Sequence, residues 1–275
     1  MFYSKSPAAA PYQGTEEQKR KRFKRMQWSS FIAITIGYSM YYVCRTSLNV
    51  VKKPIMDAGV LDASQLGLIS SALLFTYAIG KFVNGFLADH SNIRRFMATG
   101  ILVSTVANII VGILGLLTLR QTLISLSAFY VIFAILWGIN GWAQSMGAPP
   151  SIVALSRWYD DQHRGTFYGF FSASHNLGEF FSFLFVGGLV SLFGWQYGFI
   201  GAAVAGAIGV ILIVCMLYDS PESQGLPSPS MPKDKPAGGG SVGKAQLSVL
   251  RNPYVWVLAF ASAFMYISRY AVNGW

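Results

Sequence analysis

Apolar residues dominate the chain in long runs, and charged residues interrupt these runs only at wide intervals. No charged residue stands between Arg95 and Arg120, between Arg120 and Arg157, or from Phe180 to Tyr218. About 20 apolar residues in helical conformation span the roughly 30 Å hydrocarbon core of a bilayer. The pattern therefore predicts an all-α, polytopic membrane helix bundle.

Seven membrane spans are predicted from these runs. They are expected at 28–50, 65–88, 96–119, 123–155, two spans within 165–218 that are divided at 193–195, and 252–275. The chain is accordingly divided into a basic tail (1–26), a six-helix transmembrane bundle (27–218), a linker rich in Pro, Gly and Ser (219–250) and the first helix of a second half (251–275). The remainder of that second half is expected to be missing from this chain.

Composition and charge agree with a membrane protein. Apolar residues make up 53% and charged residues 12% of the chain, against roughly 25% charged residues in soluble domains. Most Lys and Arg of the connections lie in the tail and in the second, fourth and sixth connections, so these are expected to be cytoplasmic, with the protein in the cell (inner or plasma) membrane. The net charge of +10 is interpreted as this topology signal, with the tail touching anionic lipid, and not as a nucleic-acid site. Cys44 and Cys215 lie in apolar runs and are expected to be free packing residues.

Five ionisable residues lie inside predicted spans: Arg45, Lys81, His175, Glu179 and Arg269. Placing Arg or Lys at the middle of a membrane helix costs at least ~2.5 kcal/mol, so such residues normally face a water-filled cavity or a partner. Three cations face one carboxylate, which leaves positive charge to be balanced. We expect a bound anion, preferably a doubly charged one, because arginine forks bind phosphate and lysine adds a point charge.

Tyrosines accompany these residues at helical spacing. The shared faces are Tyr38, Tyr41, Tyr42 and Arg45; Tyr77, Lys81 and Asn84; Tyr168, Ser172, His175 and Glu179; Tyr266, Arg269, Tyr270 and Asn273. Pairing of the charges with one another is the alternative to anion binding. His175 is interpreted either as a hydrogen-bonded packing residue or as a group that gains a proton when an anion arrives.

Several segments resemble the organophosphate:phosphate antiporter family of the major facilitator superfamily. They are GYSMYYVCRTSLNV at 37–50, TYAIGK at 76–81, the His-Asn pair at 175–176, SPESQGLP at 220–227 and the segment 252–275 around Arg269. The resemblance implies phosphate binding by Arg45 and Arg269, one from each half of the fold. It also implies added charge from Lys81, a binding role for His175, and a path lined by Tyr38, Tyr42 and Tyr77.

A general superfamily signature lies in GFLADHSNIRR, which contains Gly85, Asp89, Arg94 and Arg95. Gly85 is expected to permit close helix approach. Asp89 and the two arginines are expected to form a charge network that breaks as the two halves rock. A topology signal with a helix cap is the alternative.

The function implied by the resemblance is transport of an organophosphate, a hexose phosphate or glycerol 3-phosphate, in exchange for inorganic phosphate by alternating access. The alternative is a membrane sensor of external sugar phosphate that signals to a histidine kinase. No enzymatic activity, metal or cofactor is expected, because no nucleophile–base pair, ligand cluster or phosphate-cradling glycine loop is seen.

Two departures from the family pattern stand out. Glu179 occupies a position that is usually small, where it would either pair with Lys81 or Arg45 or bind a sugar hydroxyl. Members of the family have twelve spans, so this chain is expected to be truncated, or to be completed by a separate C-terminal half.

Overall fold

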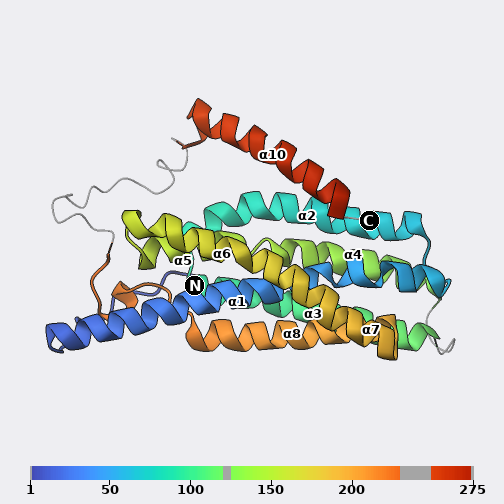
Figure 1. The fold of residues 1–275 in the computed structure, drawn as a ribbon, viewed down its shortest axis with the longest axis horizontal. Helices are drawn as coiled ribbons and strands as arrows, with labels where there is room; N and C mark the ends of the chain where they lie inside the picture. Colours follow the sequence, from blue (N-terminus) through green and yellow to red (C-terminus); the bar gives the residue numbers. More distant parts are fainter. Residues whose placement is uncertain (1, 120–124, 230–248, 274–275) are drawn as a thin grey trace. The chain divides into compact units, whose positions relative to one another are not determined.

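A computed structural model describes residues 2–119, 125–229 and 249–273. It divides into two compact units, Met1–Ser230 and Met231–Trp275. In the first unit, helices far apart in the sequence lie side by side, α1 and α3 both packing along α8 (Figure 1). The residues described form helices and no β-strand, which confirms the expected all-α class.

The first unit contains the helices that build the bundle. They are α1 (Glu16–Asp57), α2 (Ala63–His90), α3 (Ile93–Leu119), α4 (Leu126–Gln144), α5 (Ala148–Trp158), α6 (Asp161–Phe181), the π-helix η1 (Ser182–Val186), α7 (Gly187–Phe193), α8 (Trp195–Met216) and the short 3-10 helix η2 (Glu222–Gln224). The second unit contains α10 (Pro253–Asn273). The predicted linker lies partly outside the described residues, between 230 and 248.

Polar residues fix where these apolar helices begin. The Thr15 hydroxyl accepts a hydrogen bond from Gln18 N (3.3 Å) while the Gln18 side chain accepts one from Thr15 N (3.1 Å). Asp62 and Gln65 form the same reciprocal capping box at the start of α2. Each arrangement satisfies backbone donors that a helix start leaves open. Since α1 begins at Glu16, it includes most of the basic segment that the sequence assigned to the tail.

Glycine and proline set the breaks in the long apolar runs. The expected fourth span is two helices, α4 and α5, separated by a turn at 145–147 that ends at Gly147, just before Pro149 and Pro150. Proline is well tolerated in the first turn of a helix, where its missing N–H has no partner to lose. Gly194, with φ +100°, separates α7 from α8 in a backbone conformation that favours glycine.

Five of the predicted spans are long and apolar enough to cross a membrane. These segments are Ala63–His90, Ile93–Thr118, Leu126–Trp158, Asp161–Phe193 and Trp195–Met216. The first predicted span lies in α1, whose charged start and polar stripes lower its mean hydropathy. In α10 the apolar segment Pro253–Ser268 is shorter than a span, and the side chains that follow it lie outside the described residues.

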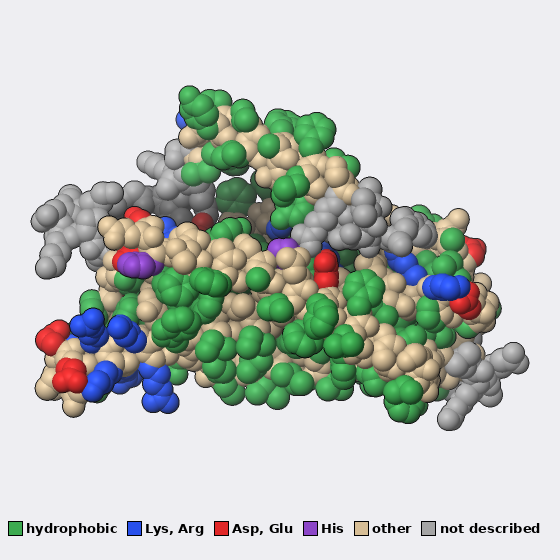
Figure 2. All heavy atoms as spheres, in the orientation of Figure 1, with side chains coloured by type: hydrophobic (Ala, Val, Ile, Leu, Met, Phe, Trp, Pro, Cys, Tyr) green, Lys and Arg blue, Asp and Glu red, His purple; other side chains and the backbone are tan. Residues whose placement is uncertain are grey.

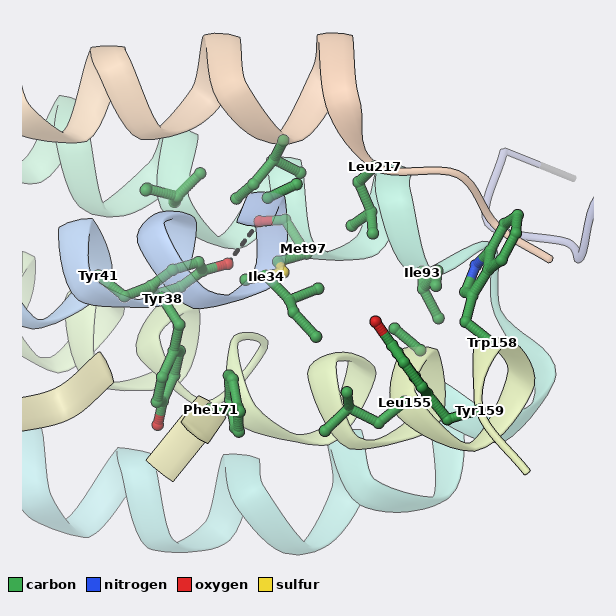
Figure 3. Close-up of a cluster of buried hydrophobic side chains, with 14 residues drawn as sticks. Ile34, Tyr38, Tyr41, Ile93, Met97, Leu155, Trp158, Tyr159, Phe171 and Leu217 are labelled. Atoms are coloured by element: carbon green, nitrogen blue, oxygen red, sulfur yellow. Dashed lines mark hydrogen bonds between the residues drawn. The ribbon is translucent and has the colours of Figure 1, made fainter. Parts of the chain in front are cut away.

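Two larger apolar clusters and a smaller one form the interior of the first unit; the smaller one consists of Val43, Val186, Ala202 and Ala205. One larger cluster contains Ile34, Tyr41, Met97 and Trp158 among others, and Figure 3 shows the Tyr41 hydroxyl pointing to Met97 O, to which it donates at 2.5 Å. The other larger cluster lies further along α1 and includes Leu48, Val51, Trp137 and Phe199. Residues 42–47 of α1 lie between the two larger clusters in sequence, and they carry the polar groups discussed below.

Small residues let α8 approach α1 and α3 closely. A methyl group at Gly206 would collide with Cys44 and Thr105, and one at Gly209 would press on Met40. Small residues at such crossings favour helix association in lipid. Many large apolar side chains on the outside of the unit are exposed, and Figure 2 shows them along the face in view, with Lys and Arg gathered over the start of α1. A bilayer is the natural surrounding for such a surface.

The N-terminal segment, the α2–α3 connection and the exit from α8 meet at one end of the first unit, called here the tail end. Asn92 N donates to Tyr3 O (2.7 Å), and Ala9 N donates to Glu222 O (2.9 Å). The carboxylate of Asp219 accepts from Ser6 N at 2.8 Å. The tail is therefore hydrogen-bonded to the bundle at several points.

Candidate functional site

The predicted site residues of α1 and α2 converge on one tyrosine. The guanidinium of Arg45 lies 4.2 Å from the ring centroid of Tyr77 and 5.6 Å from that of Tyr42. The ammonium of Lys81 lies 5.3 Å from the same Tyr77 ring. Arg45 is buried at 8% exposure, as is Tyr77. The structure thus brings two cations from different helices onto one aromatic side chain, a geometry in which the ring face attracts positive charge.

Aromatic side chains extend this site from α1 to α6. The ring of Tyr38 packs edge-on against Tyr42, with centroids 5.4 Å apart, and also against Phe171 of α6 at 5.3 Å. The imidazole of His175 lies 5.8 Å from the ring of Tyr42. Figure 3 shows Tyr38 and Phe171 pointing toward one another from their two helices. His175 is therefore close to the phosphate-binding candidates of α1, as the stripe pattern predicts.

Glycine brings α6 close enough for these contacts. A methyl group at Gly178 would collide with Ser39 O and the Tyr42 side chain. The Ser39 hydroxyl donates to Ser174 O at 2.8 Å, which fixes α6 against α1. Glu179 follows directly and is half-buried. Its role toward the cations or a substrate remains a prediction.

Arg269 belongs to α10 in the second unit, and its side chain lies outside the described residues. Its predicted role opposite Arg45 therefore stays a prediction. Tyr266 of the same stripe is exposed on α10.

The superfamily signature lies at the tail end. Gly85 is on α2, but a methyl group there would meet no described atom within 4 Å, so the close approach expected at Gly85 is not made among the residues described. Tight contacts of α2 occur instead at Gly80, where a methyl group would collide with Ser145. Arg95 donates to Phe2 O at 3.0 Å. The charge network proposed for Asp89, Arg94 and Arg95 stays a prediction.

A buried ion pair at this end was not singled out from the sequence. Arg157 NH1 and Asp219 Oδ1 lie 2.5 Å apart, and their side chains are 14% and 4% exposed. Asp219 Oδ1 also accepts from Ile93 N (3.0 Å) at the start of α3. Both residues border long charge-free runs, and that position is the sequence signal that could have indicated them.

Lys52 is a second residue that the sequence pattern does not single out. It lies just beyond the first predicted span, but α1 continues to Asp57 and buries Lys52 at 8% exposure. It follows Arg45 by seven residues, so it lies on the same stripe of α1 as Tyr38 and Arg45. The seven-residue spacing from Arg45 is the sequence signal that could have indicated Lys52.

The arrangement suits recognition of an anion. Two cations near one ring repel each other, and a ligand of opposite charge lowers that electrostatic free energy. Arginine can bind a phosphoryl group through two N–H donors, and tyrosine hydroxyls add donors on rigid rings. Among the described residues, no group of three or more His, Cys, Asp or Glu side chains is placed to hold a metal ion.

The free cysteines differ in environment. Cys44 is buried and its thiol lies 3.3 Å from Ala202 O, whereas Cys215 is exposed on α8. Both are free thiols as expected, but only Cys44 packs inside the bundle.

Comparison with known proteins gives the family. The Major Facilitator Superfamily model matches residues 34–275. The chain is 34% identical over 279 residues to a probable hexose phosphate transport protein of Chlamydia pneumoniae, covering 94% of this chain and 58% of that protein. It is 30% identical over 285 residues to the membrane sensor protein UhpC of Salmonella typhimurium, covering 100% of this chain and 61% of that protein.

A solved structure agrees with these matches. The crystal structure of a bacterial homolog of the human lysosomal transporter Spinster, inward-facing and unoccupied, aligns with a TM-score of 0.63 at 18% identity, covering 91% of this chain and 54% of that one. This likeness concerns the fold. The chain spans about three-fifths of the curated relatives that it matches. The names of these relatives confirm the resemblance to organophosphate transporters, and the family is one of transporters and not of enzymes. The chain is a multi-pass membrane protein that belongs to the Major Facilitator Superfamily.

Proposed function

We propose that this protein transports an organophosphate across the membrane, with a hexose phosphate or glycerol 3-phosphate as the substrate class, and exchanges it for inorganic phosphate. The observation that carries the proposal is the convergence of Arg45 and Lys81 on the Tyr77 ring, at 4.2 Å and 5.3 Å. The relative named as a probable hexose phosphate transport protein supports the substrate class.

The residues have distinct roles in this proposal. Arg45 binds the phosphoryl oxygens through its fork, Lys81 adds charge, and Tyr38, Tyr42 and Tyr77 line the path. His175, beside Tyr42, donates a hydrogen bond or takes up a proton as the dianion arrives. Arg269 contributes the second guanidinium from the other half of the fold.

Exchange follows from the same electrostatics. A site that holds several cations resists closure while it is empty, because closing excludes the water that screens their repulsion. A bound anion removes this penalty, so the protein changes its access only when loaded. Inorganic phosphate and the organophosphate share the group that does this, and each therefore drives the return step for the other.

Counterflow of labelled phosphate in liposomes loaded with phosphate or glucose 6-phosphate tests the proposal. Exchange should be present in the wild type and should be lost in the Arg45→Ala, Arg269→Ala double variant. Arg20→Ala, which removes an exposed arginine of α1, is the matched control and should retain exchange. Exchange that survives in the double variant would contradict the assignment.

A membrane sensor is the second candidate, because the relative named membrane sensor protein UhpC matches the whole chain. A sensor would bind external sugar phosphate through the same residues and pass the signal to a histidine kinase. Uptake of labelled glucose 6-phosphate in cells without other importers distinguishes the two. Binding without uptake, together with a kinase-dependent reporter response, would favour the sensor.

The topology is part of the proposal. We place the protein in the cell (inner or plasma) membrane with the tail end in the cytoplasm, since the basic start of α1 lies there. A reporter fused to the N-terminus that is active only in the cytoplasm should be active, and one fused between α1 and α2, near Gly59, should be inactive.

A further inference from the structure

A polar layer lies in the interior of the first unit. It consists of side chains from three helices that are all nearly inaccessible: Ser47 on α1, Ser104 and Asn108 on α3, and Asn140 and Gln144 on α4. Burying amides in an apolar bundle costs free energy unless hydrogen bonds compensate. Apolar packing alone therefore does not explain why these polar side chains are buried here.

Asn108 is the centre of this layer and is bonded mainly to α1. Its Nδ2 donates to Cys44 O at 3.0 Å and to Ser104 O at 2.9 Å. Its Oδ1 accepts from the hydroxyl of Ser47 at 2.9 Å. The carboxamide thus makes three hydrogen bonds and has 0% exposure. Two of these bonds hold α1, at the residue before Arg45 and at the second residue after it.

Neighbouring groups hold the same contact in place. Gln144 Nε2 donates to the Ser104 hydroxyl at 3.0 Å, which ties α4 to the turn of α3 that precedes Asn108. The Cys44 thiol lies 3.3 Å from Ala202 O of α8. The segment of α1 around Arg45 is therefore fixed from behind by α3 and α8.

The helical geometry connects this clamp with the site. Successive residues on a helix are about 100° apart, so Arg45 and Ser47 point to nearly opposite sides of α1. A hydrogen bond to Ser47 or to Cys44 O cannot touch a ligand at Arg45, but it fixes the rotation and axial position of the helix that carries Arg45. A shift by one residue would move the arginine by about 1.5 Å, which is enough to disturb a charged contact that needs a defined geometry.

We propose that Asn108 is a positioning residue for the anion site, which sets the orientation of Arg45 through its hydrogen bonds to Cys44 O and Ser47. This inference rests on the proposed function in so far as Arg45 binds the phosphoryl group. The structural part, that Asn108 fixes α1 in register, is independent of any ligand.

Asn140 provides a matched control. It is also a buried asparagine with 0% exposure, on α4, but neither its nitrogen nor its oxygen has a hydrogen-bond partner among the described residues. Asn108→Leu and Asn140→Leu make the same chemical change at two buried positions of the same polar layer. Only the first removes bonds to α1.

The first measurement is equilibrium binding of radiolabelled inorganic phosphate to the purified protein in lipid nanodiscs. Asn108→Leu should weaken phosphate binding about tenfold, which corresponds to the net contribution of one to two hydrogen bonds. Asn140→Leu should bind phosphate within about twofold of wild type. Equal affinities for the two variants would overturn the positioning role.

Asn108→Asp adds a readout that a general packing defect would not change. When protonated, the carboxylic acid can donate to Cys44 O and accept from Ser47, but the ionised carboxylate only accepts and would face the oxygen of Cys44. Relative to wild type at the same pH, phosphate affinity should be near normal in acid and should fall as the pH rises. A constant ratio at all pH values would contradict the proposal.

A second measurement separates this inference from the proposed function. In a Cys215→Ser background, the Arg45→Cys substitution places a thiol at the site, and its reaction rate with a membrane-impermeant thiol reagent is measured. Adding Asn108→Leu should change this rate at least about threefold. Adding Asn140→Leu should leave the rate unchanged. If wild type binds no phosphate but labelling changes as expected, the proposed function fails and the positioning role stands. If labelling is unaffected by Asn108→Leu, the positioning role fails.

Discussion

Cations lie in two regions of the bundle, and their surroundings differ. At the tail end, the Arg157 guanidinium lies 2.5 Å from the carboxylate of Asp219 and also donates to backbone carbonyls. In the middle of α1 and α2, buried Arg45 and the more exposed Lys81 both lie close to the ring of Tyr77. We therefore expect the first cation to stabilise the fold and the other two to act in the proposed anion site.

The largest effect is expected from breaking the pair at the tail end. Asp219→Ala leaves a buried guanidinium without its partner and removes the acceptor for Ser6 N and Ile93 N. Stability should fall by about 3–5 kcal/mol, measured as thermal unfolding of the purified protein. Asp57→Ala breaks the exposed pair with Lys53 and should change little.

Replacing both Arg157 and Asp219 tests whether stability is lost because the ion pair is absent or because one charge is left without its partner. Arg157→Met with Asp219→Leu should recover part of the stability that Asp219→Ala loses, because no charge is then left buried alone. A double variant less stable than the single one would show that the hydrogen bonds of Asp219 to the backbone dominate.

The second largest effect is expected at Arg45, on ligand binding and not on stability. Arg45→Ala should weaken phosphate binding by about 2–3 kcal/mol, roughly 30- to 150-fold, in the nanodisc binding assay. Arg45→Lys keeps the charge without the fork and should fall between wild type and alanine. If Arg45→Ala unfolds the protein as readily as Asp219→Ala does, the distinction between the two regions fails.

A smaller effect is expected at the ring that the two cations share. Tyr77→Leu should weaken phosphate binding by about 1 kcal/mol, roughly fivefold, because the ring no longer holds Arg45 and Lys81 near each other. Tyr77→Phe keeps the ring and should retain more affinity. Tyr197→Leu, at an exposed position of α8, is the control and should bind like wild type.

The smallest effect is expected at Lys5 of the tail. Partial desolvation, and then the charge of Arg157, lower the pKa of the largely exposed Lys5 from its usual value of 10.5, although Asp89, Asp219 and Glu222 act in the opposite direction. The charged form is thus disfavoured in the folded state, and this penalty is fully present below the folded pKa and disappears above 10.5. Lys5→Met should raise the Tm slightly at neutral pH.

The pH dependence of this stabilisation tests whether the shifted pKa of Lys5 causes it. The difference in Tm between Lys5→Met and wild type should shrink as the pH rises toward 10.5 and vanish above it. Lys24→Met removes an exposed lysine of α1 and controls for net charge. A stabilisation by Lys5→Met that does not depend on pH would exclude this cause.

The sequence predicted the spans and the stripes because these depend on short-range periodicity. Tyr38, Tyr42 and Arg45 recur at helical spacing on α1, and the structure places all three at the same site. The break between α4 and α5 escaped prediction, since the run 123–155 has no charge and only Gly147 with its prolines marks the turn. The helix also continues past the first predicted span, since Lys52 and Lys53 end the apolar run but not α1, which reaches Asp57.

The apolar runs and the charges within them were enough to predict a helical membrane protein, because run length and charge position are properties of the chain alone. Which cation meets which group depends on how the helices dock. Arg157 pairs with Asp219 across 62 positions, and Asn108 holds α1 across 64. Such contacts depend on how separate helices dock, and the periodicity of one helix carries no information about the register of its neighbour.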